Sequence, residues 1–286
     1  MMAVNQIEEQ IREKLLPQCF NAAVKAGAAI MKIYKNRDDY DISIKSDKTP
    51  ITVADRVAHT TIKEYLGTTR IPVLSEEGRE MLFDERRNWD LFLLVDPLDG
   101  TVEFIKGNNE FTVNIALMAD NVCVASVLYV PYHRKMYMAA KGHGAYMLRG
   151  IEPQDEPAYD ARRILEMRER LPLASNRHDG FRVAVSRSHQ TPETFSRIDE
   201  LRAANPDLEI VEQGSSYKFC LLAEGAVDYY VRTTNTYEWD TAAGELILAE
   251  AGGSTLSYPE GAPLLYNKSD LHNPWFEARS ATCRKI

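Results

Sequence analysis

Two acidic residues and a threonine stand in the segment Asp96-Pro-Leu-Asp-Gly-Thr101, directly after an apolar run. The run Leu91–Val95 is hydrophobic at every position, which is typical of a strand buried on both faces. Proline removes a backbone donor and glycine permits a tight turn, so Asp96 and Asp99 can converge at the end of this strand. Carboxylates held so close repel each other unless a cation lies between them. The segment therefore predicts a cation site, although Asp, Pro and Gly are also the commonest residues of an ordinary turn.

Thr101 indicates that the same segment can also bind an anion. As a predicted helix N-cap, it leaves the backbone amides of Gly100 and Thr101 facing outward, where they can bind an anion. A cation and a phosphate can therefore share one pocket.

Further acids stand where other predicted elements begin or end. Asp55 opens a helical pattern, Glu76 and Glu77 follow the short apolar run 71–74, and Asp240 precedes a helix. Each has an ordinary explanation when taken alone. Asp55 complements a helix dipole, the two glutamates are solvated at the surface, and Asp240 caps its helix. Their recurrence at the ends of apolar runs favours the cation-site hypothesis.

The composition is that of a soluble globular protein. Of its 286 residues, 44% are hydrophobic and 27% are charged. The net charge of −8 provides no global positive field and argues against nucleic acid as a partner. The N-terminus is polar and no stretch approaches the length of a membrane span, so we expect a cytoplasmic protein without stable membrane insertion. The four cysteines are widely spaced, which indicates buried thiols rather than a zinc site.

Apolar periodicity predicts an α/β fold with layered helices and sheets. Residues 1–150 form an N-terminal α+β half, 181–286 a C-terminal α/β half, and 151–180 a variable connection. The first half is predicted to hold a short helix from Ile7, a break at Pro17, an Ala-rich helix, a strand at 40–45, a hairpin of 111–118 with 122–130, and strands at 136–140 and 144–148. The connection holds a charged helix at 161–170. The second half alternates strands at 181–185, 208–211, 226–231 and 254–257 with helices at 191–204, 216–224 and 239–251.

Three acidic motifs, in this order, resemble the lithium-sensitive, magnesium-dependent phosphatases of the inositol monophosphatase superfamily: Leu74-Ser-Glu-Glu77, Asp96-Pro-Leu-Asp-Gly-Thr101 and Glu238-Trp-Asp-Thr-Ala-Ala243. The similarity extends from roughly Ala22 to Asn273. Within the superfamily, the chain is most similar to the CysQ-type 3'(2'),5'-bisphosphate nucleotidases. This closer match rests on Glu103-Phe-Ile-Lys106, Glu110-Phe-Thr-Val-Asn-Ile-Ala-Leu117, Ser186-Arg-Ser-His189, Gly214-Ser-Ser-Tyr-Lys-Phe-Cys220 and Arg232. The resemblance implies an inositol monophosphatase-like α/β/α/β/α sandwich.

The resemblance also implies a metal site and a reaction. Two to three Mg²⁺ ions are expected, and hard cations prefer such oxygen ligands. Asp55, paired with the hydroxyl of Thr101, matches the family's catalytic aspartate and deprotonates a metal-bound water. That water attacks phosphorus in line and releases the 3'-phosphate of adenosine 3',5'-bisphosphate, leaving AMP. The implied metal ligands are Glu76, Asp96, Asp99, Asp240 and the backbone carbonyl of Leu98.

A larger set of residues is implied to bind the substrate, namely Glu76, Leu98, Asp99, Gly100, Thr101, His189, Ser215, Lys218, Arg232 and Asp240. His189 is expected to face the adenine, whereas Ser215, Lys218 and Arg232 hold the sugar or the second phosphate. A lone His or Lys is more often structural or solvated. Val102 replaces a usual lysine and Asn108-Asn109 a usual Asn-Gly, both beside the phosphate loop. The segment 151–179 is not explained by the family core.

Two other functions stay open at this point. A phosphatase for inositol monophosphate or a sugar phosphate would have an acid where Arg232 stands. An interaction module with vestigial chemistry would have lost its metal ligands or gained a basic face, neither of which the sequence shows. The expected partner is a small phosphorylated nucleotide, and the chain is expected to be a monomer or homodimer. Lithium at tens of millimolar is expected to inhibit the enzyme by displacing a weakly held Mg²⁺.

Overall fold

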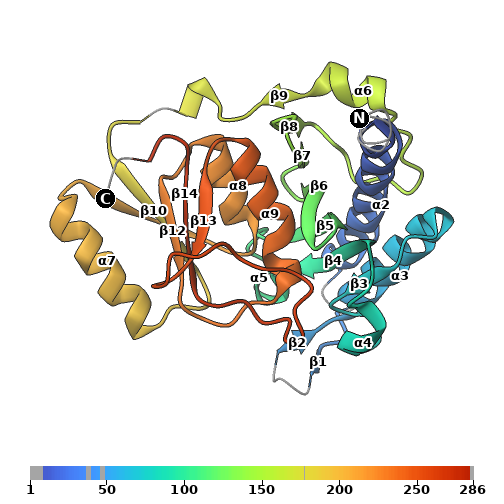
Figure 1. Cartoon of the computed structure of the whole chain (residues 1–286), viewed down its shortest axis with the longest axis horizontal. Helices are drawn as coiled ribbons and strands as arrows, with labels where there is room; N and C mark the ends of the chain where they lie inside the picture. Colours follow the sequence, from blue (N-terminus) through green and yellow to red (C-terminus); the bar gives the residue numbers. More distant parts are fainter. Residues whose placement is uncertain (1–8, 37–39, 46–48, 177, 284–286) are drawn as a thin grey trace.

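Two β-sheets with a pair of helices between them form the framework of the chain (Figure 1). The structure is a computed structural model that describes residues 9–36, 40–45, 49–176 and 178–283. Its layers follow one another from α2 (Leu16–Tyr34) and α3 (Val53–Leu66), through the seven-stranded sheet, α8 (Tyr217–Glu224) with α9 (Glu238–Glu250) and the five-stranded sheet, to α7 (Pro192–Ala204). The layered α/β/α/β/α architecture is thereby confirmed.

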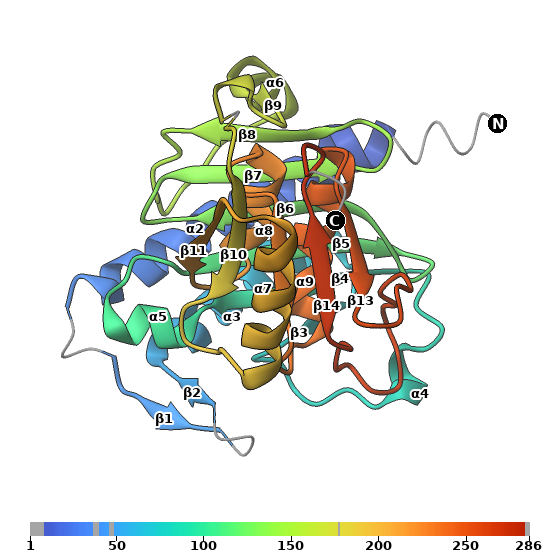
Figure 2. The same cartoon turned by 90° about the vertical axis from the view of Figure 1, so that its left-hand side faces the viewer.

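The larger sheet is mostly antiparallel. Figure 2 shows its strands from β8 and β9 at the top to β4 and β3 lower down. Asp120 and Asn121 connect β5 to β6 and have positive φ angles of 50° and 62°, as the tightest hairpin turns require. The hairpin predicted there is confirmed. In spatial order, the strands are β3 (Val73–Ser75), β4 (Leu91–Asp99), β5 (Thr112–Ala119), β6 (Val122–Val130), β7 (Lys135–Ala140), β8 (Ala145–Arg149) and β9 (Glu169–Arg170).

The smaller sheet combines parallel and antiparallel pairs. Its order is β11 (Leu208–Gln213), β10 (Phe181–Ser186), β12 (Tyr229–Arg232), β14 (Phe276–Arg279) and β13 (Ser254–Ser257). The alternation of strands and helices predicted for this half is confirmed. Strand β14 was not predicted, although Phe276–Arg279 alternates apolar and polar residues as a half-buried strand does.

Helix α2 packs small side chains against the larger sheet. Ala22, Ala23 and Ala26 are fully buried, so the helix backbone comes close to the strands. The predicted break at Pro17 was wrong. A π-helical turn (Ile11–Leu15) continues directly into α2, and the proline lies in the first turn of α2, where its missing N–H is tolerated. The predicted start of the helix at Ile7 lies outside the described residues.

The connection between the two halves packs on the N-terminal half. Its helix α6 (Ala161–Met167) is shorter than predicted, because Glu169 and Arg170 form strand β9 and extend the larger sheet. Asn21 of α2 donates to the carbonyl oxygen of Tyr159 over 2.9 Å and accepts its amide over 3.0 Å. The division at 1–150 and 181–286 stays a prediction. Among the described residues, no helix has both the length and the apolar composition required to cross a bilayer.

Candidate active site

Strand β4 brings the central acidic segment into a pocket. The predicted strand 91–95 continues to Asp99, with a register shift against β5 between Asp96 and Asp99. A bulge of this kind re-aims side chains at the end of a strand. The amide of Leu98 donates to Asp96 over 3.0 Å, and the amide of Ser216 donates to Asp99. Asp96, Leu98 and Asp99 all line the same pocket, which an isolated surface turn would not provide.

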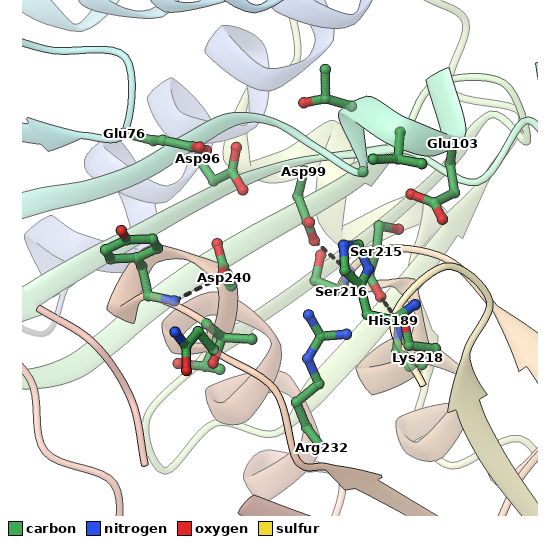
Figure 3. A pocket seen from close by; sticks show the side chains of 18 of the residues that line it. Glu76, Asp96, Asp99, Glu103, His189, Ser215, Ser216, Lys218, Arg232 and Asp240 are labelled. Atoms are coloured by element: carbon green, nitrogen blue, oxygen red, sulfur yellow. Dashed lines mark hydrogen bonds between the residues drawn. The ribbon is translucent and has the colours of Figure 1, made fainter. Parts of the chain in front are cut away.

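Three carboxylates meet at one side of this pocket. Oxygens of Glu76, Asp96 and Asp240 all lie within 4.8 Å of one another, and Figure 3 shows the three side chains grouped together. Glu76 and Asp96 are neighbours because β3 runs parallel to β4 with Ser75 opposite Val95. Asp240 comes from the first turn of α9. It accepts the amide of Tyr237 over 2.8 Å, so it caps the helix as well as lining the pocket.

Burial and mutual repulsion make this cluster costly without a cation. Burial raises the pKa of Glu76 to about 7, although Lys45 opposes the shift. The pKa values of Asp96 and Asp240 are also raised well above their usual range, first by burial and then by the neighbouring carboxylates. The Nζ atom of Lys45 lies 2.8 Å from Glu76 and also contacts Glu77. Glu77 therefore pairs with a lysine and is not simply solvated.

The donor set of the cluster fits Mg²⁺. Its ligand atoms are hard carboxylate oxygens, and no thiolate or imidazole belongs to it among the described residues. Asp99 lies in the same pocket but outside this three-residue cluster, and its carboxylate accepts the amide of Ser216.

The metal-free protein is expected to lose stability as pH rises from about 4.5 to about 7. The raised pKa of Glu76 means that the folded state binds more protons than the unfolded state in this interval. Its stabilising contribution is therefore complete below the ordinary value of 4.5 and is lost as pH passes 7. Saturating Mg²⁺ should abolish this loss. Thermal denaturation in EDTA and in Mg²⁺ tests the prediction, and a midpoint that rises with pH in EDTA over this interval would contradict it.

Asp55 is held behind the pocket by three hydrogen bonds. Its Oδ2 accepts the amide of Thr52 over 2.7 Å and the hydroxyl over 2.6 Å, as in a capping box at the start of α3. Its Oδ1 accepts the hydroxyl of Thr101 over 2.9 Å. Asp55 is thus a capping residue, and it also contacts the threonine that lines the pocket. Burial raises its pKa.

Gly100 allows two loops to meet at the pocket. Its φ of +91° lies in the left-handed region, and an added Cβ would come within 3.0 Å of the carbonyl oxygen of Glu110 and 3.1 Å of the Cβ of Ser215. A side chain at this position would therefore separate α5 (Thr101–Lys106) from the turn before α8. Ser215 itself has a φ of 49°, a strained value for a non-glycine residue at a pocket wall.

The unusual Asn108-Asn109 pair has a local explanation. Asn109 has a φ of 68°, and asparagine tolerates this left-handed region better than most residues with a side chain. Asn109 can therefore stand where the resemblance implies a glycine. Its side chain also accepts the hydroxyl of Tyr34 over 2.7 Å.

The other side of the pocket is basic. Lys218 is only 2% exposed, and its Nζ donates to the carbonyl oxygens of Gln213 over 3.0 Å and Ser215 over 2.6 Å. Burial, followed by the charge of Arg232, lowers the pKa of Lys218 to about 7. The Nε of Arg232 is buried and makes no hydrogen bond within the described part of the chain. An N–H group without a partner at a pocket wall is suited to a ligand acceptor.

His189 is neutral at pH 7. Burial lowers its pKa to about 4, and the charges of Arg232 and Lys218 act in the same direction. A neutral imidazole suits the flat face or edge of a base better than it suits a phosphate.

The structure brings the predicted site residues together. Asp55 contacts the pocket through Thr101, and the other predicted residues all line it: Glu76, Asp96, Leu98, Asp99, Gly100, Thr101, His189, Ser215, Lys218, Arg232 and Asp240. Lys45 was not predicted as a site residue. It follows the short strand β1 (Ser43–Ile44), where a longer strand was predicted. No role was predicted for Glu103 or Ser216. Glu103 and Ser216 lie inside motifs that resemble the family, so their positions could have indicated a role. No sequence motif contains Lys45, and its partners are distant in sequence.

Comparison with known proteins agrees with this geometry. The sequence profile of the inositol monophosphatase family matches residues 12–283. The chain belongs to the inositol monophosphatase family. It is 38% identical over 265 residues to the 3'(2'),5'-bisphosphate nucleotidase CysQ of Shigella flexneri, covering 92% of this chain and 98% of the relative. The CysQ of Escherichia coli K12 is 37% identical over the same length.

Two solved structures superpose on the chain. The crystal structure of CysQ from Bacteroides thetaiotaomicron matches with a TM-score of 0.86 and 44% identity, covering 96% of this chain and 98% of that one. The extragenic suppressor protein suhB of Bartonella henselae matches with a TM-score of 0.72 and 26% identity, covering 93% of each chain. The family's fold therefore extends over nearly the whole chain.

Proposed function

We propose that the protein is a magnesium-dependent phosphatase that removes the 3'-phosphate of adenosine 3',5'-bisphosphate and leaves AMP. The observation that carries this proposal is the polarity of the pocket. Acidic Glu76, Asp96 and Asp240 lie at one side, and basic Lys218 and Arg232 lie at the other (Figure 3). A substrate with two phosphates can place one against bound metal and the other against the cations. The names of the CysQ relatives support this choice of substrate.

The acidic side would hold two to three Mg²⁺ ions through Glu76, Asp96, Asp99, Asp240 and the carbonyl oxygen of Leu98. When bound, Mg²⁺ supplies Lewis-acid stabilisation of phosphate charge and lowers the pKa of a coordinated water. The acidic cluster thus becomes compatible with an anionic substrate.

Asp55 and Thr101 would move the proton of the attacking water. Because the Thr101 hydroxyl donates to Asp55 over 2.9 Å, its oxygen retains lone pairs that can accept a proton from the pocket side. Asp55 cannot turn toward the pocket, since its other oxygen is fixed by Thr52. The threonine hydroxyl therefore orients the water and passes its proton to the carboxylate.

The basic side would bind the 5'-phosphate and the nucleoside. The Nε of Arg232 has no partner among the described residues, and the guanidinium geometry suits a phosphate oxygen. In its protonated form, Lys218 uses two of its three N–H groups on carbonyl oxygens and has one left for the substrate. Ser215 lies beside it, and neutral His189 would contact the adenine.

Replacing Arg232 with methionine is expected to raise KM for adenosine 3',5'-bisphosphate by about 10-fold to 100-fold, the usual cost of a charge-assisted hydrogen bond. Adenosine 3'-monophosphate has no 5'-phosphate and should be affected much less. Arg202→Met, at an exposed position of α7, serves as the matched control. Steady-state kinetics on both substrates measure the difference. An equal change on the two substrates would show that Arg232 does not bind the 5'-phosphate.

The direct test of the function is phosphate release with Mg²⁺ from three substrates side by side: adenosine 3',5'-bisphosphate, inositol 1-phosphate and fructose 1,6-bisphosphate. We expect a strong preference for the nucleotide and no release in EDTA. Preference for inositol phosphate or the sugar bisphosphate would retain the metal chemistry and refute the assignment of the basic side.

A further inference from the structure

One buried acid in the pocket has no role in the proposed chemistry. Glu103 lies in the first turn of α5 and is 3% exposed. It lines the pocket on the side of His189 and Lys218, away from the three-carboxylate cluster (Figure 3). Its Oε1 is buried and accepts no hydrogen bond from any residue that the structure describes. A carboxylate oxygen in this state is costly, because it has lost its water and gained no donor.

The side chain of Glu103 is fixed in place. Gly214 packs directly on it, so that an added Cβ at this glycine would lie 2.3 Å from the Cγ of Glu103 and 2.9 Å from its Cδ. The carboxylate therefore cannot swing toward the turn before α8 to find a donor there. Glu103 attracts the positive charges of Lys218 and Arg187, yet neither residue donates a hydrogen bond to the Oε1 of Glu103. A donor on a molecule bound in the pocket would satisfy this oxygen.

We propose that Glu103 is a specificity-determining residue that accepts a hydrogen bond from the nucleoside part of the substrate. This inference rests on the proposed function. In adenosine 3',5'-bisphosphate, both phosphates are acceptors, and the 3'- and 5'-hydroxyls are esterified. The only N–H or O–H donors of the nucleoside are the 6-amino group of the base and the 2'-hydroxyl of the ribose. Glu103 therefore favours a nucleotide that carries such a donor over an isosteric one that lacks it.

The test compares wild type and Glu103→Met on three substrates: the 3',5'-bisphosphates of adenosine, of purine riboside, which lacks the 6-amino group, and of 2'-deoxyadenosine. Methionine keeps the unbranched stem that packs on Gly214 and removes the acceptor. We expect kcat/KM for the adenosine compound to fall by about 10-fold to 100-fold. The analogue that lacks the matching donor should be hydrolysed equally by both proteins, which identifies the donor.

Glu110→Gln is the matched control. Glu110 also lies beside Gly214, whose amide it accepts over 2.7 Å, but it pairs with Arg187 and does not line the pocket. Glu110→Gln should change kcat/KM by the same factor for all three substrates. The same uniform factor for Glu103→Met, or no change, would overturn the inference. Glu103→Gln, which preserves shape, should show a smaller loss with the same substrate dependence, and thermal denaturation checks that each variant is folded. If wild type hydrolyses none of the three, it is the proposed function that fails.

Discussion

Asp96→Asn is expected to lower kcat by at least about a thousandfold, because bound metal contributes several kcal/mol of transition-state stabilisation and each 1.4 kcal/mol corresponds to about a factor of ten. Asp96 is 1% exposed and is one of the three carboxylates of the acidic cluster. Phosphate release from adenosine 3',5'-bisphosphate at saturating Mg²⁺ measures the effect. Asp84→Asn, at an exposed position of α4 (Phe83–Arg86), is the control.

The same substitution should have the opposite effect on the metal-free fold. A neutral amide in place of the Asp96 carboxylate would remove one buried negative charge from a cluster whose members repel one another. We therefore expect the variant to melt at a higher temperature than wild type in EDTA and to gain little from added Mg²⁺. Activity within tenfold of wild type, or an unchanged stabilisation by Mg²⁺, would contradict the assignment of Asp96 as a metal ligand.

Asp55→Asn is expected to lower kcat by about 100-fold to 10,000-fold, the range associated with a lost general base. Unlike Asp96, Asp55 lies behind the cluster, so stabilisation by Mg²⁺ should be retained. An asparagine can still accept from Thr52, and the cap of α3 is preserved. Thr101→Val provides an independent test, since it removes the hydroxyl that joins Asp55 to the pocket and should reproduce most of the loss. Stopped assays of phosphate release with melting curves in Mg²⁺ separate the two residues, and loss of the stabilisation would show that Asp55 acts through the metal.

Local signals carried the prediction of the acidic segment. The apolar run before Asp96 specified a buried strand, and the Asp-Gly pair specified a turn, so both carboxylates could be placed at a strand end from neighbouring residues alone. The grouping of Glu76 and Asp240 with Asp96 is different. Nothing in their spacing brings them together, since it depends on how β3 pairs with β4 and on where α9 begins. Only the resemblance to a known family supplied that information.

Contacts between distant segments account for what was missed. Lys45 pairs with Glu76 and Glu77, and a lone lysine after a short strand carries no pattern that predicts such contacts. Pro17 was expected to break a helix, but a π-turn accommodates it in the first turn of α2. The role assigned to Glu103 depends on an absent hydrogen bond, and a sequence cannot show which buried oxygen lacks a donor among the described residues.

The acidic cluster joins separate layers of the molecule. Asp96 belongs to the larger sheet, whereas Asp240 belongs to the helix α9 that packs between the two sheets. A cation held by both residues would act as a removable cross-link. Like a disulfide, it would close the long loop of chain between Asp96 and Asp240. A ligand that binds only the folded state raises stability with its concentration. The supply of magnesium would therefore set the resistance of this chain to proteases as well as the rate at which it releases phosphate.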